Sequence, residues 1–143
     1  MGRKLAFFCI IMLSACQLLK PVNPDVQASR FLGSYRWKPI QIHGKIPPGT
    51  AAYLEFDLDR QSLHGHTGCN TITGRVDLDT DSIHFSNIRS TEKACDAPFN
   101  EVEQALYALL LSGSFRYDIA EQTLNLYRQD QLVLMLGLLK KEK

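Results

Sequence analysis

The residues with the clearest chemical potential in this sequence are His64, His66 and Cys69, which fall within six consecutive positions. Side chains two positions apart in a strand share a face, so both imidazoles would lie together, with the cysteine following after a turn. Two imidazoles and a thiolate suit zinc or copper. If Cys69 forms a disulfide, the thiolate is lost, and His64 and His66 are two exposed histidines beside a bridge. The metal site and the bridge exclude each other.

Other catalytic or metal-binding patterns are incomplete. The helix-end sequence Ser112-Gly113-Ser114 lacks the Gly-x-Ser-x-Gly pattern of a nucleophile elbow. A thiol enzyme at Cys69 would need a third group to orient its histidine, and none is evident. Asp77-x-Asp79-x-Asp81 begins like a calcium loop, but Ser82 replaces the required glycine. We therefore predict no catalytic residues, no enzymatic activity and no cofactor.

The chain begins like an exported bacterial lipoprotein. Two basic residues precede the apolar run Leu5–Leu13, which is about half of the roughly 20 residues needed to cross a bilayer. The run ends in Leu13-Ser14-Ala15-Cys16, which resembles the lipobox of bacterial lipoproteins. This predicts that residues 1–15 are a removed signal peptide and that Cys16 carries the lipid. An ordinary signal peptide with a chance cysteine is the alternative.

The segment after the lipobox predicts how the domain is held at a membrane. Residues 16–29 are polar, contain Pro21 and Pro24 and lack periodicity, so we expect a lipidated tether before a domain at 30–143. Gln17 is not the aspartate associated with inner-membrane retention, which favours the outer membrane, facing the periplasm. Removal of residues 1–15 changes the formal net charge from +1 to −1, so a nucleic-acid partner is not expected.

The cysteine count predicts one disulfide. Cys9 would be discarded with the signal peptide and Cys16 lipidated, which leaves Cys69 and Cys95 in an oxidising compartment. Asn70 tolerates the left-handed conformation and can bond its own backbone, so Gly-Cys-Asn is typical of a sharp corner between strands. The bridge would tie this corner to the segment before the predicted helix.

Alternating hydrophobicity predicts about eight short antiparallel strands and one helix. The strand signals are near 37–42, 54–58, 63–67, 71–78, 83–88, 115–119, 124–126 and 132–139. The last run has little alternation, so it is either buried on both faces or the weakest assignment. The helix follows Cys95, with Asp96 as a cap, Pro98 in its first turn and Gly113 at its end. We predict a mainly β fold: a small, partly open antiparallel barrel with the helix covering one end or seam.

These residues resemble the META domain, also called the HslJ-like family after a bacterial heat-shock lipoprotein. The match runs from the opening tryptophan strand through the central Gly-Cys-Asn stretch to the Thr-x-x-Ala-Cys element. The residues that carry it are Trp37, Gly65, Gly68, Cys69, Asn70, Gly74, Thr91, Ala94 and Cys95. Lys93 and Ile72 depart from the family pattern, where methionine and an aromatic residue are common.

The resemblance implies a compact β fold with one helix and links the protein to envelope stress, heat shock and antibiotic tolerance. It supplies no catalytic residue. We therefore expect a lipid-anchored envelope protein with a structural or binding role and an unidentified protein partner. The alternatives are a carrier of a small apolar ligand in the barrel mouth and a periplasmic metal-binding protein that uses His64, His66 and Cys69.

Overall fold

The computed structural model describes residues 24–45, 47, 49, 51–97 and 99–140. The predicted signal peptide, Cys16, the tether up to residue 23 and Pro98 lie outside these residues. The elements in chain order are α1 (Pro24–Ser34), β1 (Arg36–Ile42), β2 (Tyr53–Asp57), β3 (Ser62–His66), β4 (Thr71–Leu78), β5 (Ser82–Ser90), α2 (Phe99–Leu111), β6 (Ser114–Ala120), β7 (Thr123–Arg128) and β8 (Gln131–Leu139).

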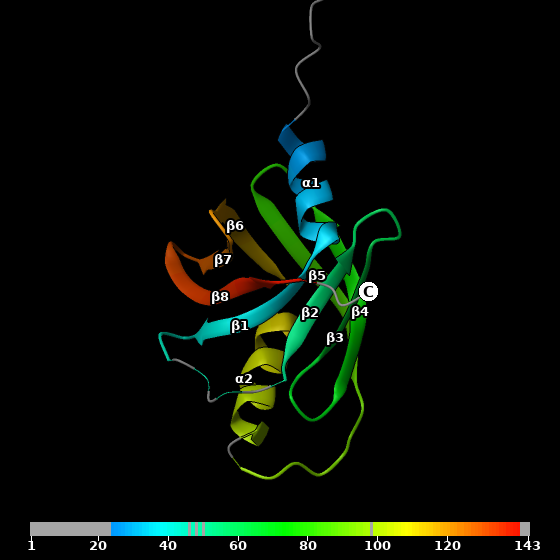
Figure 1. Ribbon diagram of the computed structural model, residues 1–143, viewed down its shortest axis with the longest axis vertical. Coiled ribbons are helices and arrows are strands. Elements are labelled where there is room, and N and C mark those ends of the chain that lie inside the picture. Colours follow the sequence, from blue (N-terminus) through cyan, green and yellow to red (C-terminus); the bar gives the residue numbers. More distant parts are fainter. Residues whose placement is uncertain (1–23, 46, 48, 50, 98, 141–143) are drawn as a thin grey trace, which may run out of the picture.

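The eight strands form one closed antiparallel ring. Each strand pairs with its neighbour in sequence, and β8 returns to pair with β1 along almost its whole length, from Arg36 opposite Leu139 to Ile42 opposite Leu134. The short hairpin connections suit antiparallel pairing. The predicted mainly β fold with eight antiparallel strands is confirmed, although the barrel is closed and not partly open, because β8 pairs with β1 (Figure 1).

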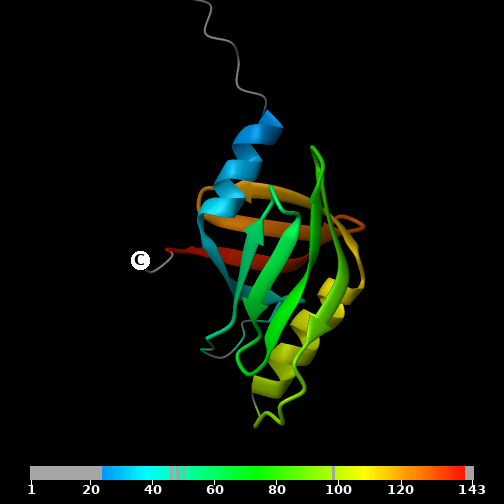
Figure 2. The same ribbon diagram turned by 90° about the vertical axis from the view of Figure 1, so that its right-hand side faces the viewer.

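Two seams of the ring are short. Only Arg36 and Trp37 of β1 have register partners in β2, and only residues 82–84 of β5 have register partners in β6. The other neighbouring strands share at least five register pairs. Strand β5 continues past its short pairing with β6, and helix α2 packs against β5. The predicted helix therefore covers this seam (Figure 2).

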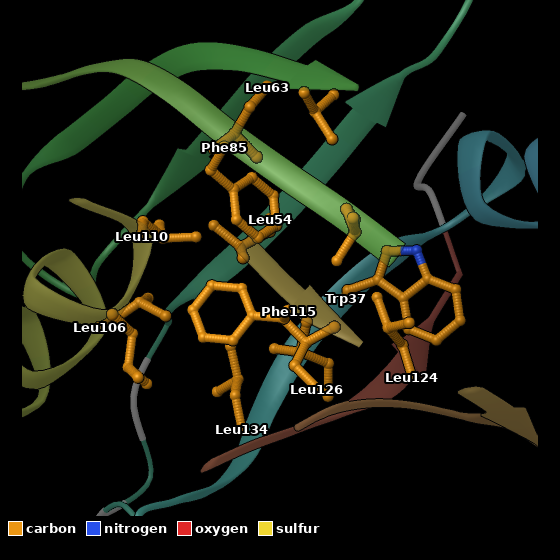
Figure 3. Packing of buried hydrophobic residues seen from close by; sticks show 14 of the residues in the cluster. Trp37, Leu54, Leu63, Phe85, Leu106, Leu110, Phe115, Leu124, Leu126 and Leu134 are labelled. Atoms are coloured by element: carbon orange, nitrogen blue, oxygen red, sulfur yellow. The ribbon is translucent and has the colours of Figure 1, made fainter. Parts of the chain in front are cut away.

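Side chains fill the interior of the ring. Trp37, Phe56, Phe85 and Phe115 come from four strands and are at most 3% exposed. Figure 3 shows Leu106 and Leu110 of α2 pointing toward Phe115 and Leu54 from the side of the helix. Helical spacing places the buried residues of α2 on one face, as the sequence predicts. The helix therefore completes the core.

The expectation of a structureless tether up to residue 29 is wrong for residues 24–29, because α1 begins at Pro24. Proline suits the first helical turn, where its missing N–H has no helical partner to lose. Leu32 anchors the helix: its side chain is fully buried, and its carbonyl accepts a hydrogen bond of 3.0 Å from Trp37 Nε1. The described residues thus form two helices. Neither described helix is long and apolar enough to cross a membrane.

The apolar run at the chain's end is a strand that is buried on both faces at Val133 and Leu134 but on one face only further along. Leu134 and Leu136 of β8 point into the core, whereas Met135 is partly exposed and Leu139 is 42% exposed. The run therefore places apolar side chains on the outer face of the barrel as well as inside it.

Candidate functional site

The Gly-Cys-Asn corner between β3 and β4 is closed by Thr67. The Thr67 amide donates to the Asn70 carbonyl at 2.8 Å, and the Asn70 amide donates to Thr67 Oγ1 at 3.1 Å. Gly68 takes the left-handed conformation, with φ of 104°. The predicted sharp corner is present, and Gly68 rather than Asn70 supplies its left-handed residue. Its side chain is free to bond elsewhere because Thr67 and Gly68 form the turn.

A disulfide joins Cys69 to Cys95, with the two Cα atoms 6.0 Å apart. It connects the corner to the segment that leads from β5 into α2, where the Asn100 amide donates to the Asp96 carbonyl at 3.3 Å. The predicted pairing is therefore present in the structure. Both cysteines are partly exposed, so the bridge lies at the surface of the barrel end that carries α2.

The Asn70 side chain is the centre of this end of the molecule, and it is only 2% exposed. Its Oδ1 accepts hydrogen bonds from Thr91 Oγ1 at 2.7 Å and the Lys93 amide at 2.9 Å. Its Nδ2 donates to the Lys93 carbonyl at 3.2 Å and to Glu103 Oε1 at 2.6 Å. One amide thus joins the corner, the segment after β5 and α2, and both of its polar atoms are satisfied internally.

The remaining motif residues mostly support this arrangement. A Cβ at Gly65 would lie 2.4 Å from the Tyr53 carbonyl oxygen, so only glycine allows β2 and β3 to approach there. Ile72 is fully buried in the core, and Lys93 is exposed and contributes its backbone to the network. Ala94 is exposed, and nothing in the structure explains its place in the motif.

His64 and His66 share the outer face of β3, as predicted from their spacing. His64 is exposed, whereas His66 is partly buried, stacks on the Tyr53 ring and accepts a hydrogen bond of 3.1 Å from the Gly68 amide. Within the described residues, the group with metal-ligand spacing is Cys69, Cys95 and Glu103, not the histidines. Because both cysteines are bridged, this group offers no thiolate.

A serine–histidine contact was missed by the sequence analysis. His84 Nδ1 lies 2.7 Å from Ser114 Oγ, on neighbouring strands. Asp77 lies opposite His84 on β4, but its carboxylate accepts hydrogen bonds from Gln61 and Arg75. No spacing in the sequence brings Ser114 to His84, because the contact depends on the β5–β6 register. The pair is exposed, and Asp77 is held by other partners.

Two surface groups have shifted pKa values. The Arg60 amide and guanidinium, which bond the Asp57 carboxylate, lower the pKa of Asp57. A hydrogen bond to Asp118, together with partial desolvation, raises the pKa of Tyr127. Both shifts stabilise the protonation state that prevails near neutral pH. Neither group belongs to the corner.

An open polar hollow of about 400 Å³ lies beside Asn70. Thr91, Lys93, Glu103 and Tyr107 are among the residues that line it. The hollow is open to solvent, and most of the residues that line it are polar or charged. A carrier of an apolar molecule needs an enclosed apolar cavity instead, and the described side chains fill the centre of the barrel.

Comparisons with known proteins identify the fold and the family. The family model described as META domain matches residues 30–140. An NMR structure of a protein from Burkholderia xenovorans has a TM-score of 0.64 and 20% identity, over 85% of this chain and 91% of that chain. Another NMR structure has a TM-score of 0.61 and 21% identity, over 82% and 95%. A search of curated proteins found no significant match.

Proposed function

This chain belongs to the META domain family, and we propose from that premise that it is a lipid-anchored protein of the bacterial envelope. In this proposal the protein has a structural or binding role and no enzymatic activity. That role contributes to resistance against envelope stress such as heat or antibiotics. The proposed location is the periplasmic side of the outer membrane.

The observation that carries the proposal is the bridged corner. Cys69 and Cys95 are joined to each other, and the Asn70 amide is fully used by Thr91, Lys93 and Glu103. Functional groups that a catalytic site would direct toward a substrate are here directed toward one another. A disulfide also suits an oxidising compartment, which agrees with the signal peptide predicted at residues 1–15.

The anchoring part of the proposal is tested with Cys16→Ser. A lipoprotein cysteine carries more than one acyl chain, and one chain alone binds membranes only marginally. We expect the Cys16→Ser protein to stay as unprocessed precursor or to leave the membrane fraction, whereas a Cys9→Ser control is processed normally. Normal processing and membrane partition of Cys16→Ser would refute the lipid anchor.

The stress role is tested in cells that lack the gene. Wild-type protein should restore survival after heat or antibiotic exposure, and Cys16→Ser should restore it poorly. A pull-down of the lipidated protein from the stressed envelope should recover a protein partner. Equal survival with and without the gene under every stress tested would refute the role.

The carrier and metal-binding alternatives have less support. The barrel interior is occupied by side chains such as Trp37 and Phe85, and the cysteine of the predicted metal site is in a disulfide. Two free thiols and bound zinc or copper in the purified protein would favour the metal-binding alternative.

A further inference from the structure

We propose that the outer face of β4 and β5 holds a binding site for a phosphate group. The site is a shallow hollow of about 470 Å³ lined by Gln61, Thr73, Gly74, Arg75, Asn87 and Arg89. It lies on the wall of the barrel, apart from the Asn70 corner, and it does not depend on the function proposed above.

A break in strand register forms the hollow. Thr73 pairs with Arg89 and Arg75 pairs with Ser86, so Gly74 alone faces two residues of β5. These two residues are Asn87 and Ile88, and Asn87 has a φ of 52°. A Cβ on Gly74 would lie 2.4 Å from Ile88 Cδ1 and 3.2 Å from the Ser86 carbonyl oxygen. Such a bulge bends the strand and redirects the side chains beside it.

One of the two guanidinium groups at the hollow is held in place. Arg75 Nε donates to Asp77 Oδ2 at 3.2 Å, and Arg75 Nη2 donates to Gln61 Oε1. Gln61 Nε2 also donates to Asp77 Oδ1 at 2.6 Å, which closes a network of three side chains. The Arg75 side chain therefore needs little reordering before it binds a ligand.

The hollow has an excess of positive charge. Asp77 balances Arg75, but none of the ion pairs among the residues that the structure describes includes Arg89. Thr73 and Asn87 add a hydroxyl and an amide donor beside Arg89. A guanidinium binds phosphate oxygens through paired hydrogen bonds, and neutral donors complete such a site. A phosphate monoester, free or on a lipid headgroup, fits this set of donors.

The test is an NMR titration of the full chain in detergent micelles with inorganic phosphate at constant ionic strength. We expect saturable shifts at the amides of Thr73, Asn87 and Arg89. Arg89→Gln should weaken binding by about tenfold, as expected when a charge-assisted contact is lost, and Arg89→Lys should have an intermediate effect. Arg116→Gln is the matched control, because Arg116 is an exposed arginine over the Tyr127 ring on another part of the barrel.

Non-saturable shifts, or equal weakening by Arg89→Gln and Arg116→Gln, would overturn the proposal. The source of the phosphate is identified by competition with phosphatidic acid, a lipid with a phosphate monoester, added to the detergent micelles. Displacement of inorganic phosphate by micelles that contain phosphatidic acid, but not by micelles that contain phosphatidylcholine, supports the site with a lipid headgroup as its ligand. Saturable binding without such competition supports the site with a soluble phosphate as its ligand.

Discussion

The replacement Asn70→Asp tests the role of the Asn70 side chain with almost no change of shape. In the wild type, Nδ2 donates to Glu103 Oε1 at 2.6 Å and to the Lys93 carbonyl at 3.2 Å. The variant puts a carboxylate oxygen at that position, opposite two acceptors. The contacts of Oδ1 with Thr91 and Lys93 are unchanged, so the effect of the variant comes from the Nδ2 side alone.

The loss in the free energy of unfolding equals the smaller of two costs: repulsion between two charged carboxylates, or protonation of the introduced carboxyl. Two full charges 2.6 Å apart repel by about 6 kcal/mol at an effective dielectric constant of about 20. Protonating the introduced carboxyl at about pH 7, against an ordinary pKa of about 3.9, costs about 4 kcal/mol. Protonation is cheaper, and it also restores a donor toward Glu103. We therefore expect a loss of about 4 kcal/mol near pH 7, reduced somewhat because Glu103 is partly exposed to solvent.

The pH dependence follows from the sign of this shift. The introduced carboxyl has a higher pKa in the folded protein than in the unfolded chain. The folded variant therefore binds more protons, and its stability falls as the pH rises through the interval between the two values. Relative to the wild type, the loss should be about 1.5 kcal/mol near pH 5 and should grow toward pH 7.

The assay is denaturant unfolding at several pH values. Asn70→Ala is the control, because it removes the hydrogen bonds of both Oδ1 and Nδ2 without adding a charge, so its loss of stability should be the same at every pH. Adding Glu103→Gln to Asn70→Asp should recover most of the loss near pH 7. If Asn70→Asp and Asn70→Ala had the same pH profile, the assigned contact between Nδ2 and Glu103 would be wrong.

Three further predictions concern other parts of the fold. Replacing Cys69 and Cys95 together by serine should lower the free energy of unfolding by about 3.5 kcal/mol, because the bridge closes a loop over a sequence separation of 26 residues. Thermal unfolding measures this loss, and an unchanged midpoint would contradict the prediction. Leu32→Ala should cost about 2–4 kcal/mol in denaturant unfolding, since the side chain is fully buried, and a cost near zero would show that α1 does not anchor the barrel. Asp118→Asn should lower the pKa of Tyr127 toward its ordinary value of about 10 in an absorbance titration. The Asp118 interaction stabilises the wild type below about pH 10, and this stabilisation should disappear as the pH rises through the folded-state pKa of Tyr127, whereas an unchanged titration would exclude Asp118 as the cause.

The parts of the fold that follow local patterns were predictable from the sequence. Alternation located the strands, and helical spacing with Gly113 at its end located α2, where Gly113 has a φ of 91°. The disulfide followed from the cysteine count. Helix α1 was not predicted, because its first residues follow a proline-containing segment without periodicity. Among the α1 residues whose burial the structure describes, Leu32 is the one that is fully buried in the core, while Phe31 is only partly buried. A proline at a helix start and a single anchoring residue leave little trace in periodicity.

The candidate sites were less predictable because their residues meet only through tertiary structure. Asn70 bonds Glu103, which is 33 positions away, and no local spacing indicates that contact. Side chains two positions apart in a strand share a face, so the common face of His64 and His66 could be predicted. The stacking of His66 on Tyr53, however, depends on the register between β2 and β3. The hollow at Arg75 and Arg89 depends on a bulge, which shifts the register of two strands by one residue.

The pairing of the first strand with the last has a consequence for the order of folding. Half of the barrel wall, β2 to β5, is built from consecutive hairpins that can pair as soon as they are available. Strand β1 gains most of its partners only from β8, whose residues 131–139 come at the end of the domain. Contacts between distant segments form late, because closing the intervening chain costs entropy. The ring therefore cannot close until residues 131–139 are available, and the unpaired edge of β1 must be kept from other strands until then.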